Sequence, residues 1–233
     1  MHIPNNFLDP KVSASLSFAS AAAIVYCFNK VMERATSPAA QEAFAAAGQA
    51  MSTITSKARR AINEFGRSLL LKMAAVGSLI FVAQMFDFPV AHGTSGHLLG
   101  CALASIALGP WAGAVAMAAV LIIQCLLLGD GGLLALGANI FNMAIIGSIG
   151  AYCIYYLIRA KVKGKAGYYL AVATASWLSV VTAAAVTALE VGLSGTFELS
   201  WTLSSMVSVH AIVGVAEALI TIAVLGLFNP PTS

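Results

Sequence analysis

The sequence predicts an all-α integral membrane protein with about seven transmembrane helices. Of its 233 residues, 60% are hydrophobic and 9% are charged, whereas about 25% of the residues in an average soluble domain are charged. The apolar residues form runs close to the roughly 20 residues that a helix needs to cross about 30 Å of hydrocarbon. We therefore expect residues 1–233 to form a single transmembrane domain.

Seven apolar segments define the predicted spans. They lie at about 12–30, 68–87, 97–109, 110–129, 137–158, 168–193 and 201–228. The third segment is short, and the Gly109-Pro110 pair behind it indicates a tight turn between two helices. One bent helix over residues 97–128 is the alternative, but it would reach about 48 Å at 1.5 Å per residue. Because that length exceeds the hydrocarbon thickness, we prefer two helices.

Lysine and arginine predict the orientation of the spans, because cytoplasmic loops are enriched in both. One basic group follows the first span and extends into the second: Lys30, Arg34, Lys57, Arg59, Arg60, Arg67 and Lys72. The other follows the fifth span: Arg159, Lys161, Lys163 and Lys165. Seven spans place both groups on one side and only Lys11 on the other. The N-terminus is therefore expected outside the cell and the C-terminus inside.

The first inner loop contains a segment, residues 38–66, that we predict to be an amphipathic cytoplasmic helix. Its apolar residues recur at spacings of three and four: Phe44, Ala47, Met51, Ile54, Ala58, Ile62 and Phe65. Such a helix lies on the membrane surface or against a partner. Ser37 is its expected N-cap, with Pro38 as the first helical residue. A solvated linker with helical bias is the alternative.

Residues 1–11 are expected to form an extracytoplasmic N-terminus that captures a metal ion. The Met1 α-amine, the main-chain nitrogen of His2 and the His2 imidazole can form two fused chelate rings around one ion. Tetragonal nitrogen donor sets favour Ni(II) or Cu(II), and a fourth nitrogen would close the plane. The alternative is an ordinary start codon followed by a chance histidine.

The outer loop over residues 89–97 carries two further histidines, His92 and His97, on the same side as the N-terminus. Its glycines let the main chain bend sharply and approach a ligand closely. We expect His97 to contribute to a metal site, with His92 as a weaker candidate and Ser95 beside them. A single loop histidine can instead be solvated or cap a helix.

Polar residues in the later spans are candidates to surround the ion or to line its path. Asn139 and Asn142 are neighbours on one helix face and could brace the other outer loop; hydrogen bonding between helices is the alternative. His210 and Glu217 share one face of the last span, about 10 Å apart along its axis. Ionisable groups within a span usually face a bundle interior or a cavity, although a mutually satisfied pair is also compatible with this spacing.

Four stretches of the sequence together resemble the CbiM/NikM family, the substrate-capture (S) components of energy-coupling-factor transporters for cobalt and nickel. They are Met1-His2-Ile3-Pro4 with Phe7-Leu8; Gly93-Thr94-Ser95-Gly96-His97; Gly129-Asp130-Gly131-Gly132 with Leu136-Gly137-Ala138-Asn139-Ile140-Phe141-Asn142-Met143; and His210-Ala211-Ile212-Val213-Gly214. The resemblance runs from residue 1 to about residue 225. It implies that Co(II) or Ni(II) is the transported substrate, without an organic cofactor. The implied ligands are the Met1 amine, the His2 amide and imidazole, and the His97 imidazole.

The same resemblance implies how such a subunit works in a cell. It would be a multi-pass protein of the plasma (inner) membrane of a prokaryote, in contact with lipid. Its expected partners are a transmembrane coupling (T) subunit, two cytoplasmic ATPase subunits and, often, a small accessory membrane protein; nucleic acid is not among them. ATP hydrolysis would occur in the partners, so the chain itself is not expected to be an enzyme.

Some positions depart from the family pattern. Asn5-Asn6 stands where an acidic residue and glycine are usual, Ala91-His92 stands where Gly or Pro-Gly is usual, and the 38–66 insertion is long. His92 could compete with His97 or supply a fifth, apical ligand. A fifth ligand would suit Co(II) better than strictly square-planar Ni(II).

Two other classes of function are alternatives. Gly93-Thr94-Ser95-Gly96 matches the GxSG of rhomboid intramembrane serine proteases, with His210 as a candidate base for Ser95. This motif lies in a loop after Pro89, and the sequence has no Trp-Arg dipeptide in an outer loop, which disfavours that interpretation. The other alternative is a metal permease or sensor that acts alone and differs only in its partners.

Overall fold

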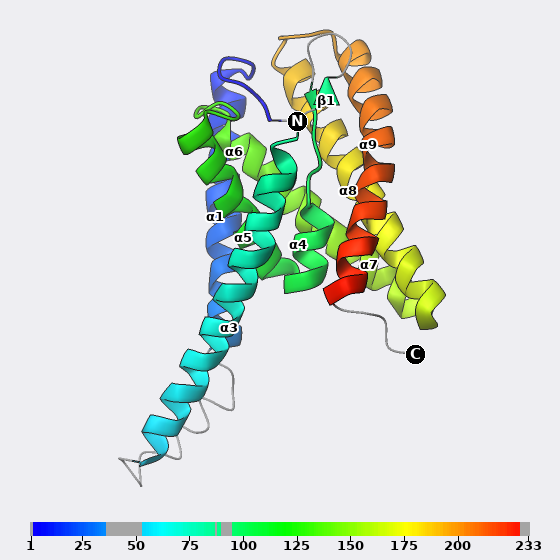
Figure 1. Cartoon of the computed structure of the whole chain (residues 1–233). Helices are drawn as coiled ribbons and strands as arrows, with labels where there is room; N and C mark the ends of the chain where they lie inside the picture. Colours follow the sequence, from blue (N-terminus) through cyan, green and yellow to red (C-terminus); the bar gives the residue numbers. More distant parts are fainter. Residues whose placement is uncertain (1, 36–52, 87, 90–94, 229–233) are drawn as a thin grey trace.

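The computed structural model describes residues 2–35, 53–86, 88–89 and 95–228, and these residues are almost entirely helical (Figure 1). The elements are α1 (Pro10–Ala35), α3 (Thr53–Gln84), β1 (Phe88–Pro89), β2 (Ser95–Gly96), α4 (Cys101–Leu108), α5 (Pro110–Ile123), η2 (Gln124–Leu128), α6 (Leu136–Asn139), η3 (Ile140–Ile149), α7 (Gly150–Lys161), α8 (Gly164–Leu193) and α9 (Leu199–Phe228). The η segments are π-helical. The two short strands pair antiparallel, with Phe88 opposite Gly96.

Six helical stretches of the described chain are long and apolar enough to cross a membrane. They are Pro10–Glu33, Arg67–Gln84, Pro110–Leu128, Leu136–Lys161, Gly164–Leu193 and Leu199–Leu227. These stretches confirm the predicted all-α, multi-pass membrane fold. The remaining predicted span contains only α4, which has eight residues and therefore reaches about 12 Å at 1.5 Å per residue.

The start of the predicted third span is not helical. Residues 97–100 lie outside any helix, and α4 begins only at Cys101. Gly100 has a φ of 75°, in the left-handed region that favours glycine. The N–H groups of Leu99 and Gly100 donate to a side chain of α9 instead of to helical carbonyls. The prediction of a helix over residues 97–109 is thus wrong for its first four residues.

The predicted turn at Gly109-Pro110 is confirmed and separates α4 from α5. Gly109 has a φ of 85°. Pro110 is the first residue of α5, where the missing N–H costs no helical hydrogen bond. The two helices then pack closely, because a Cβ on Gly113 would lie only 2.6 Å from Ser105 Cα.

The predicted amphipathic segment over residues 38–66 is described only in part. Residues 38–52 lie outside the described chain, whereas residues 53–66 form the first part of α3. α3 continues to Gln84 without a break, and its 32 residues extend about 48 Å at 1.5 Å per residue. Its first half leaves the helical bundle (Figure 1). A surface location for this segment stays a prediction.

Small residues allow the close packing of these helices. Ser20 of α1 donates its hydroxyl to the Gly137 carbonyl at 2.6 Å. α8 buries a row of alanines against its neighbours: Ala171, Ala175, Ala183, Ala184 and Ala188. In lipid, where apolar side chains gain little by leaving their solvent, such close van der Waals contact is a main source of helix association.

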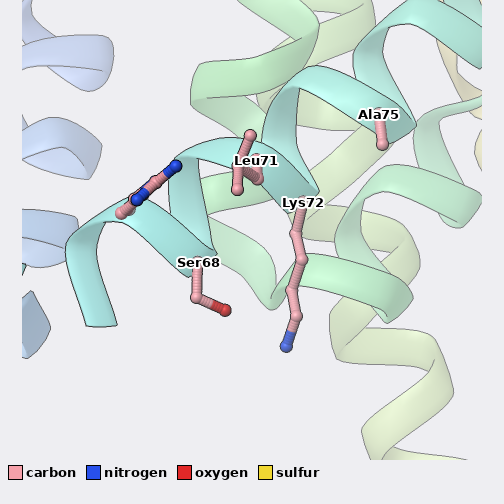
Figure 2. Close-up of a pocket in the computed structure, with 5 residues that line it drawn as sticks. Ser68, Leu71, Lys72 and Ala75 are labelled. Atoms are coloured by element: carbon pink, nitrogen blue, oxygen red, sulfur yellow. The ribbon is translucent and has the colours of Figure 1, made fainter. Parts of the chain in front are cut away.

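The two ends of the bundle carry different groups. The N-terminal tail and the β1–β2 ladder lie at one end, and the α7–α8 connection lies at the other (Figure 1). Arg159 in the last turn of α7 and Lys163 in the connection bond to main-chain carbonyls there. A shallow pocket of about 420 Å³ lies at the Arg67 end of the apolar part of α3, lined by Arg67, Ser68, Leu71, Lys72 and Ala75 (Figure 2). Which end faces the cytoplasm stays a prediction.

Candidate metal-binding site

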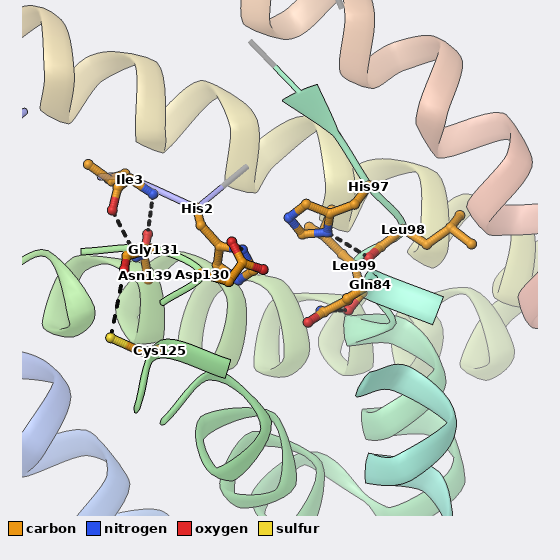
Figure 3. A network of polar contacts seen from close by, with 10 residues as sticks. All are labelled: His2, Ile3, Gln84, His97, Leu98, Leu99, Cys125, Asp130, Gly131 and Asn139. Carbon is orange, nitrogen blue, oxygen red and sulfur yellow. Dashed lines mark hydrogen bonds and ion pairs between the residues drawn. The ribbon is translucent and has the colours of Figure 1, made fainter. Parts of the chain in front are cut away.

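The N-terminal tail is fixed by hydrogen bonds to the main chain of Ile3. Asn139 accepts from Ile3 N through Oδ1 at 2.8 Å and donates from Nδ2 to Ile3 O at 3.3 Å. Gly132 N donates to the same Ile3 carbonyl at 2.8 Å, and the Ile3 side chain is buried. Ile3, which follows His2, is therefore held by three hydrogen bonds. These bonds fix the direction in which the His2 side chain points (Figure 3).

The loop between η2 and α6 approaches this tail closely enough to require glycine. Gly131 has a φ of 78°, and a Cβ on it would lie 2.8 Å from Asn139 Nδ2 and 3.2 Å from His2 Cβ. A Cβ on Gly132 would lie 2.3 Å from Asn5 N. Because glycine alone has no Cβ, the Gly131-Gly132 pair lets the tail lie directly on the loop.

His2 contacts one acidic and one aromatic partner. Its imidazole stacks on that of His97, with ring centroids 4.7 Å apart and ring planes 21° apart. His2 Nδ1 lies 2.9 Å from Asp130 Oδ1, with 5% of the His2 side chain and 37% of the Asp130 side chain exposed. The hydrogen bond with His2 lowers the pKa of the Asp130 carboxyl, while partial burial acts in the opposite direction. Asp130 therefore stays an anion at the mouth of the site.

His97 is held as one defined tautomer. Its Nδ1 lies 2.9 Å from the carbonyl oxygen of Leu98, and a carbonyl can only accept, so Nδ1 carries the hydrogen. Nε2 then holds a lone pair; it is buried and has no hydrogen-bond partner among the described residues. Ligating histidines typically donate their other ring nitrogen to a carbonyl or carboxylate in this way.

The extended segment that carries His97 is fastened by two buried side chains from other helices. Gln84 at the end of α3 donates to Leu99 O at 2.6 Å. Glu217 of α9 accepts from Leu99 N at 2.9 Å and from Gly100 N at 2.6 Å. Both carboxylate oxygens of Glu217 thus accept hydrogen bonds from the main chain. The segment is thus held from α3 and from α9, and Figure 3 shows the attachment to Gln84 of α3.

The two asparagines have different roles. Asn139 braces the N-terminal tail rather than the other outer loop. Asn142 donates from Nδ2 to Thr187 Oγ1 at 3.1 Å and to Glu190 Oε2 at 2.7 Å, which joins η3 to α8. The expectation that Asn142 braces an outer loop is therefore wrong, because its side chain points from the next helical turn into the α8 interface.

The other predicted site residues are placed less completely. Met1 and His92 lie outside the described residues, and Ser95 pairs with Pro89 in the β1–β2 ladder. His210 donates from Nδ1 to Met206 O at 2.8 Å, so it does not pair with Glu217. In the described part of the chain, no group of three or more His, Cys, Asp and Glu side chains could hold a metal ion.

Three parts of this arrangement were missed by sequence reasoning. Asp130 is one, and the signal that the sequence offers for it is a single acidic residue among glycines. Gln84 lies at the end of an apolar span and gave no pattern that points to Leu99. The main chain of Ile3 carries no side-chain signature at all.

A family model described as the cobalt uptake substrate-specific transmembrane region matches residues 2–230 of this chain. A putative fused nickel transport protein of Archaeoglobus fulgidus is 42% identical over 162 residues, which are 69% of this chain and 53% of that protein. A putative metal transport protein of Haloquadratum walsbyi is 35% identical over 228 residues, which are 96% of this chain and 88% of that protein. The chain thus spans about half the length of the fused relative.

Two solved structures share the fold over nearly the whole chain. A truncated transition metal transporter superposes with a TM-score of 0.75 at 29% identity, covering 98% of each chain. A second transition metal transporter gives a TM-score of 0.77 at 28% identity, covering 98% of this chain and 92% of the other.

Proposed function

The chain belongs to the CbiM family of cobalt-uptake transmembrane regions, and on that premise we propose that it captures Co(II) or Ni(II) as the substrate-binding subunit of an energy-coupling-factor importer. The observation that carries the proposal is the stacked pair of His2 and His97, each fastened by its own hydrogen-bond network. Relatives of the chain are named as metal transport proteins rather than enzymes. The Ser95–His210 protease interpretation is therefore not retained.

The proposed ligands are the Met1 α-amine, the His2 main-chain nitrogen, His2 Nδ1 and His97 Nε2. Ligation through Nδ1 closes a six-membered ring with the His2 main-chain nitrogen, fused to the five-membered ring that the amine forms. His97 offers Nε2 because its Nδ1 is committed to Leu98 O. A planar set of nitrogen donors suits a square-planar or tetragonal ion.

When the ion binds to these ligands, it displaces protons from their nitrogen atoms. His2 Nδ1 contacts Asp130, and the metal takes the place of the hydrogen at that contact. The amine and the main-chain amide also lose protons when they ligate, so affinity falls as the solution becomes more acidic. Asp130 reaches solvent with about a third of its side chain and offers the displaced proton a route out.

The number of ligands decides between the candidate ions. His92 is proposed as a candidate for a fifth ligand. Ser95 adjoins the segment that carries His97. Co(II) accepts an added apical ligand, whereas low-spin Ni(II) prefers the plane alone. The described residues support the planar set through His2 and His97.

The importer would contain a T subunit, two cytoplasmic ATPase subunits and, often, a small accessory membrane protein. Large apolar side chains on α1 and α3, including Phe18, Leu70 and Leu71, are exposed on the described chain, as expected for contact with lipid or membrane partners. A stand-alone metal permease or sensor is the alternative. Co-purification of an ATPase with this chain from native membranes supports the importer, and its isolation alone supports the alternative.

The ligand set is tested by equilibrium binding of Ni(II) and Co(II) to the detergent-purified chain. One form has a native N-terminus, a second carries two additional N-terminal residues, and a third carries His97→Ala. Both changes are expected to abolish high-affinity binding. Lys11→Ala, an exposed residue of α1, is the control and should leave affinity unchanged. Full affinity in the extended form or in His97→Ala would refute the proposed ligands.

A further inference from the structure

His210 carries the same structural signature as His97. Its Nδ1 donates to the Met206 carbonyl at 2.8 Å, which leaves the lone pair on Nε2. His210 is 1% exposed, and its Nε2 has no hydrogen-bond partner among the described residues. A buried polar atom without a partner is rare in a folded protein and calls for an explanation.

Glu217 sets the position of His210 relative to His97. Glu217 is bonded to the main chain at Leu99 and Gly100, and His210 lies two helical turns before it on the same face of α9, about 10 Å along the axis. His97 lies three residues before Gly100, a distance of at most about 10 Å along the chain. His210 lies toward one end of the molecule from Glu217, and His97 lies toward the same end from Gly100. The β1–β2 ladder and the first half of α9 lie together at that end (Figure 1).

One further observation agrees with this placement: residues of β2, directly before His97, contact α9. His97, from the segment before α4, and His210, from α9, therefore lie at the same end of the bundle.

We propose that His97 Nε2 and His210 Nε2 form a second, inner binding site for the transported Co(II) or Ni(II). Neutral imidazole nitrogens suit both ions, and the two backbone carbonyls fix both rings in the ligating tautomer. His97 is shared with the outer chelate, so an ion that leaves Met1 and His2 keeps one bond while it moves inward. Water fills its remaining coordination positions. This site rests on the proposed function, since it receives the ion from the outer chelate.

The inner site is tested with the outer chelate blocked. The probe is Co(II) alone, titrated into the detergent-purified full chain that carries two additional N-terminal residues, with binding followed by calorimetry and by visible absorption. This form is expected to bind one Co(II) more weakly than the native chain. His210→Asn should weaken that residual binding at least tenfold, because the asparagine amide can still donate to Met206 O but supplies no nitrogen at the Nε2 position. His97→Ala should have the same effect.

Two controls keep the outcomes distinct. Ser208→Ala changes an exposed residue of α9 whose hydroxyl bonds only within its own helix, and it should leave residual binding unchanged. Metal-free His210→Asn should melt and elute from a sizing column as the unsubstituted chain does, which shows that the variant folds. Absence of residual binding in the extended chain, or residual binding unaffected by His210→Asn, would overturn the inner site. Equal binding by the native and extended chains would instead overturn the outer chelate.

Discussion

At the scale of single residues, the site depends on side chains that hold other groups in place rather than on a cluster of acidic or cysteine ligands. Asn139 uses both ends of its amide on Ile3, Glu217 uses both carboxylate oxygens on Leu99 and Gly100, and His97 uses Nδ1 on a carbonyl. Each of these bonds orients a nitrogen of the proposed site. The loss of any of these hydrogen bonds should therefore change metal affinity by displacing a ligand nitrogen.

Asn139→Ala is expected to weaken Ni(II) and Co(II) binding about 10- to 100-fold, the range typical for residues that orient metal ligands. The change removes two of the three hydrogen bonds to Ile3 and frees the tail that carries Met1 and His2. The matched control is Asn142→Ala, one turn further along, which bonds to α8 and not to the tail. Equilibrium binding that is equally affected by the two changes would contradict a specific role for Asn139.

Asp130→Asn is expected to lower the melting temperature of the metal-free protein at pH 7. The pKa of Asp130 is lowered from its ordinary 3.8 by the hydrogen bond with His2, so the contact adds stability above about pH 4 and loses it as the pH falls through the folded-state pKa. The difference in melting temperature between the two proteins should therefore shrink in acid. A difference that is constant with pH would show that the carboxylate charge is not involved.

At the scale of elements, the loop after η2 and the segment before α4 are shaped by close contacts that a helix could not make. Gly131 lies against His2 and Asn139, whereas Gly129 has a similar φ of 68° but open space around its Cβ position. The two glycines thus separate the effect of backbone strain from the effect of contact with the tail.

Gly131→Ala is expected to reduce metal affinity more than Gly129→Ala. Both substitutions place alanine in a left-handed conformation, with a similar cost of about 1–2 kcal/mol in folding free energy. Only the Cβ at Gly131 would push Asn139 Nδ2 and His2 Cβ from their places. Thermal unfolding and binding measured on both variants should show greater destabilisation and weaker affinity for Gly131→Ala. Equal affinities would mean that the tail does not need to lie on this loop.

The sequence predicted these elements unequally. The long apolar helices and the Gly109-Pro110 turn followed from hydrophobic length and from the backbone preferences of two residues. The non-helical start at residues 97–100 did not, because Glu217, which replaces the helical hydrogen bonds there, lies more than a hundred positions away. Asn139 and Asn142 look equivalent by their spacing in the sequence. Only the arrangement of the elements around them shows that Asn139 bonds to the N-terminal tail and Asn142 to α8.

At the scale of the whole molecule, the fold brings the N-terminal tail and the last helix together around one polar centre. The N-terminal tail, the segment before α4 and the last helix, α9, meet at the same end of the bundle (Figure 1). Glu217 links α9 to the segment that carries His97, so a shift of α9 would move that histidine. In the proposed importer, α9 is therefore a route by which ion capture is coupled to the partner subunits.

X-ray absorption at the metal edge of the Ni(II)- or Co(II)-loaded native chain tests the central claim most directly, because it identifies the atoms bound to the ion. The ligands proposed from Met1, His2 and His97 predict a coordination sphere dominated by nitrogen, with imidazole scattering that decreases in His97→Ala. A sphere of oxygen atoms alone, a sulfur neighbour, or a spectrum unchanged by His97→Ala would contradict capture of the ion by the N-terminus and the outer-loop histidine.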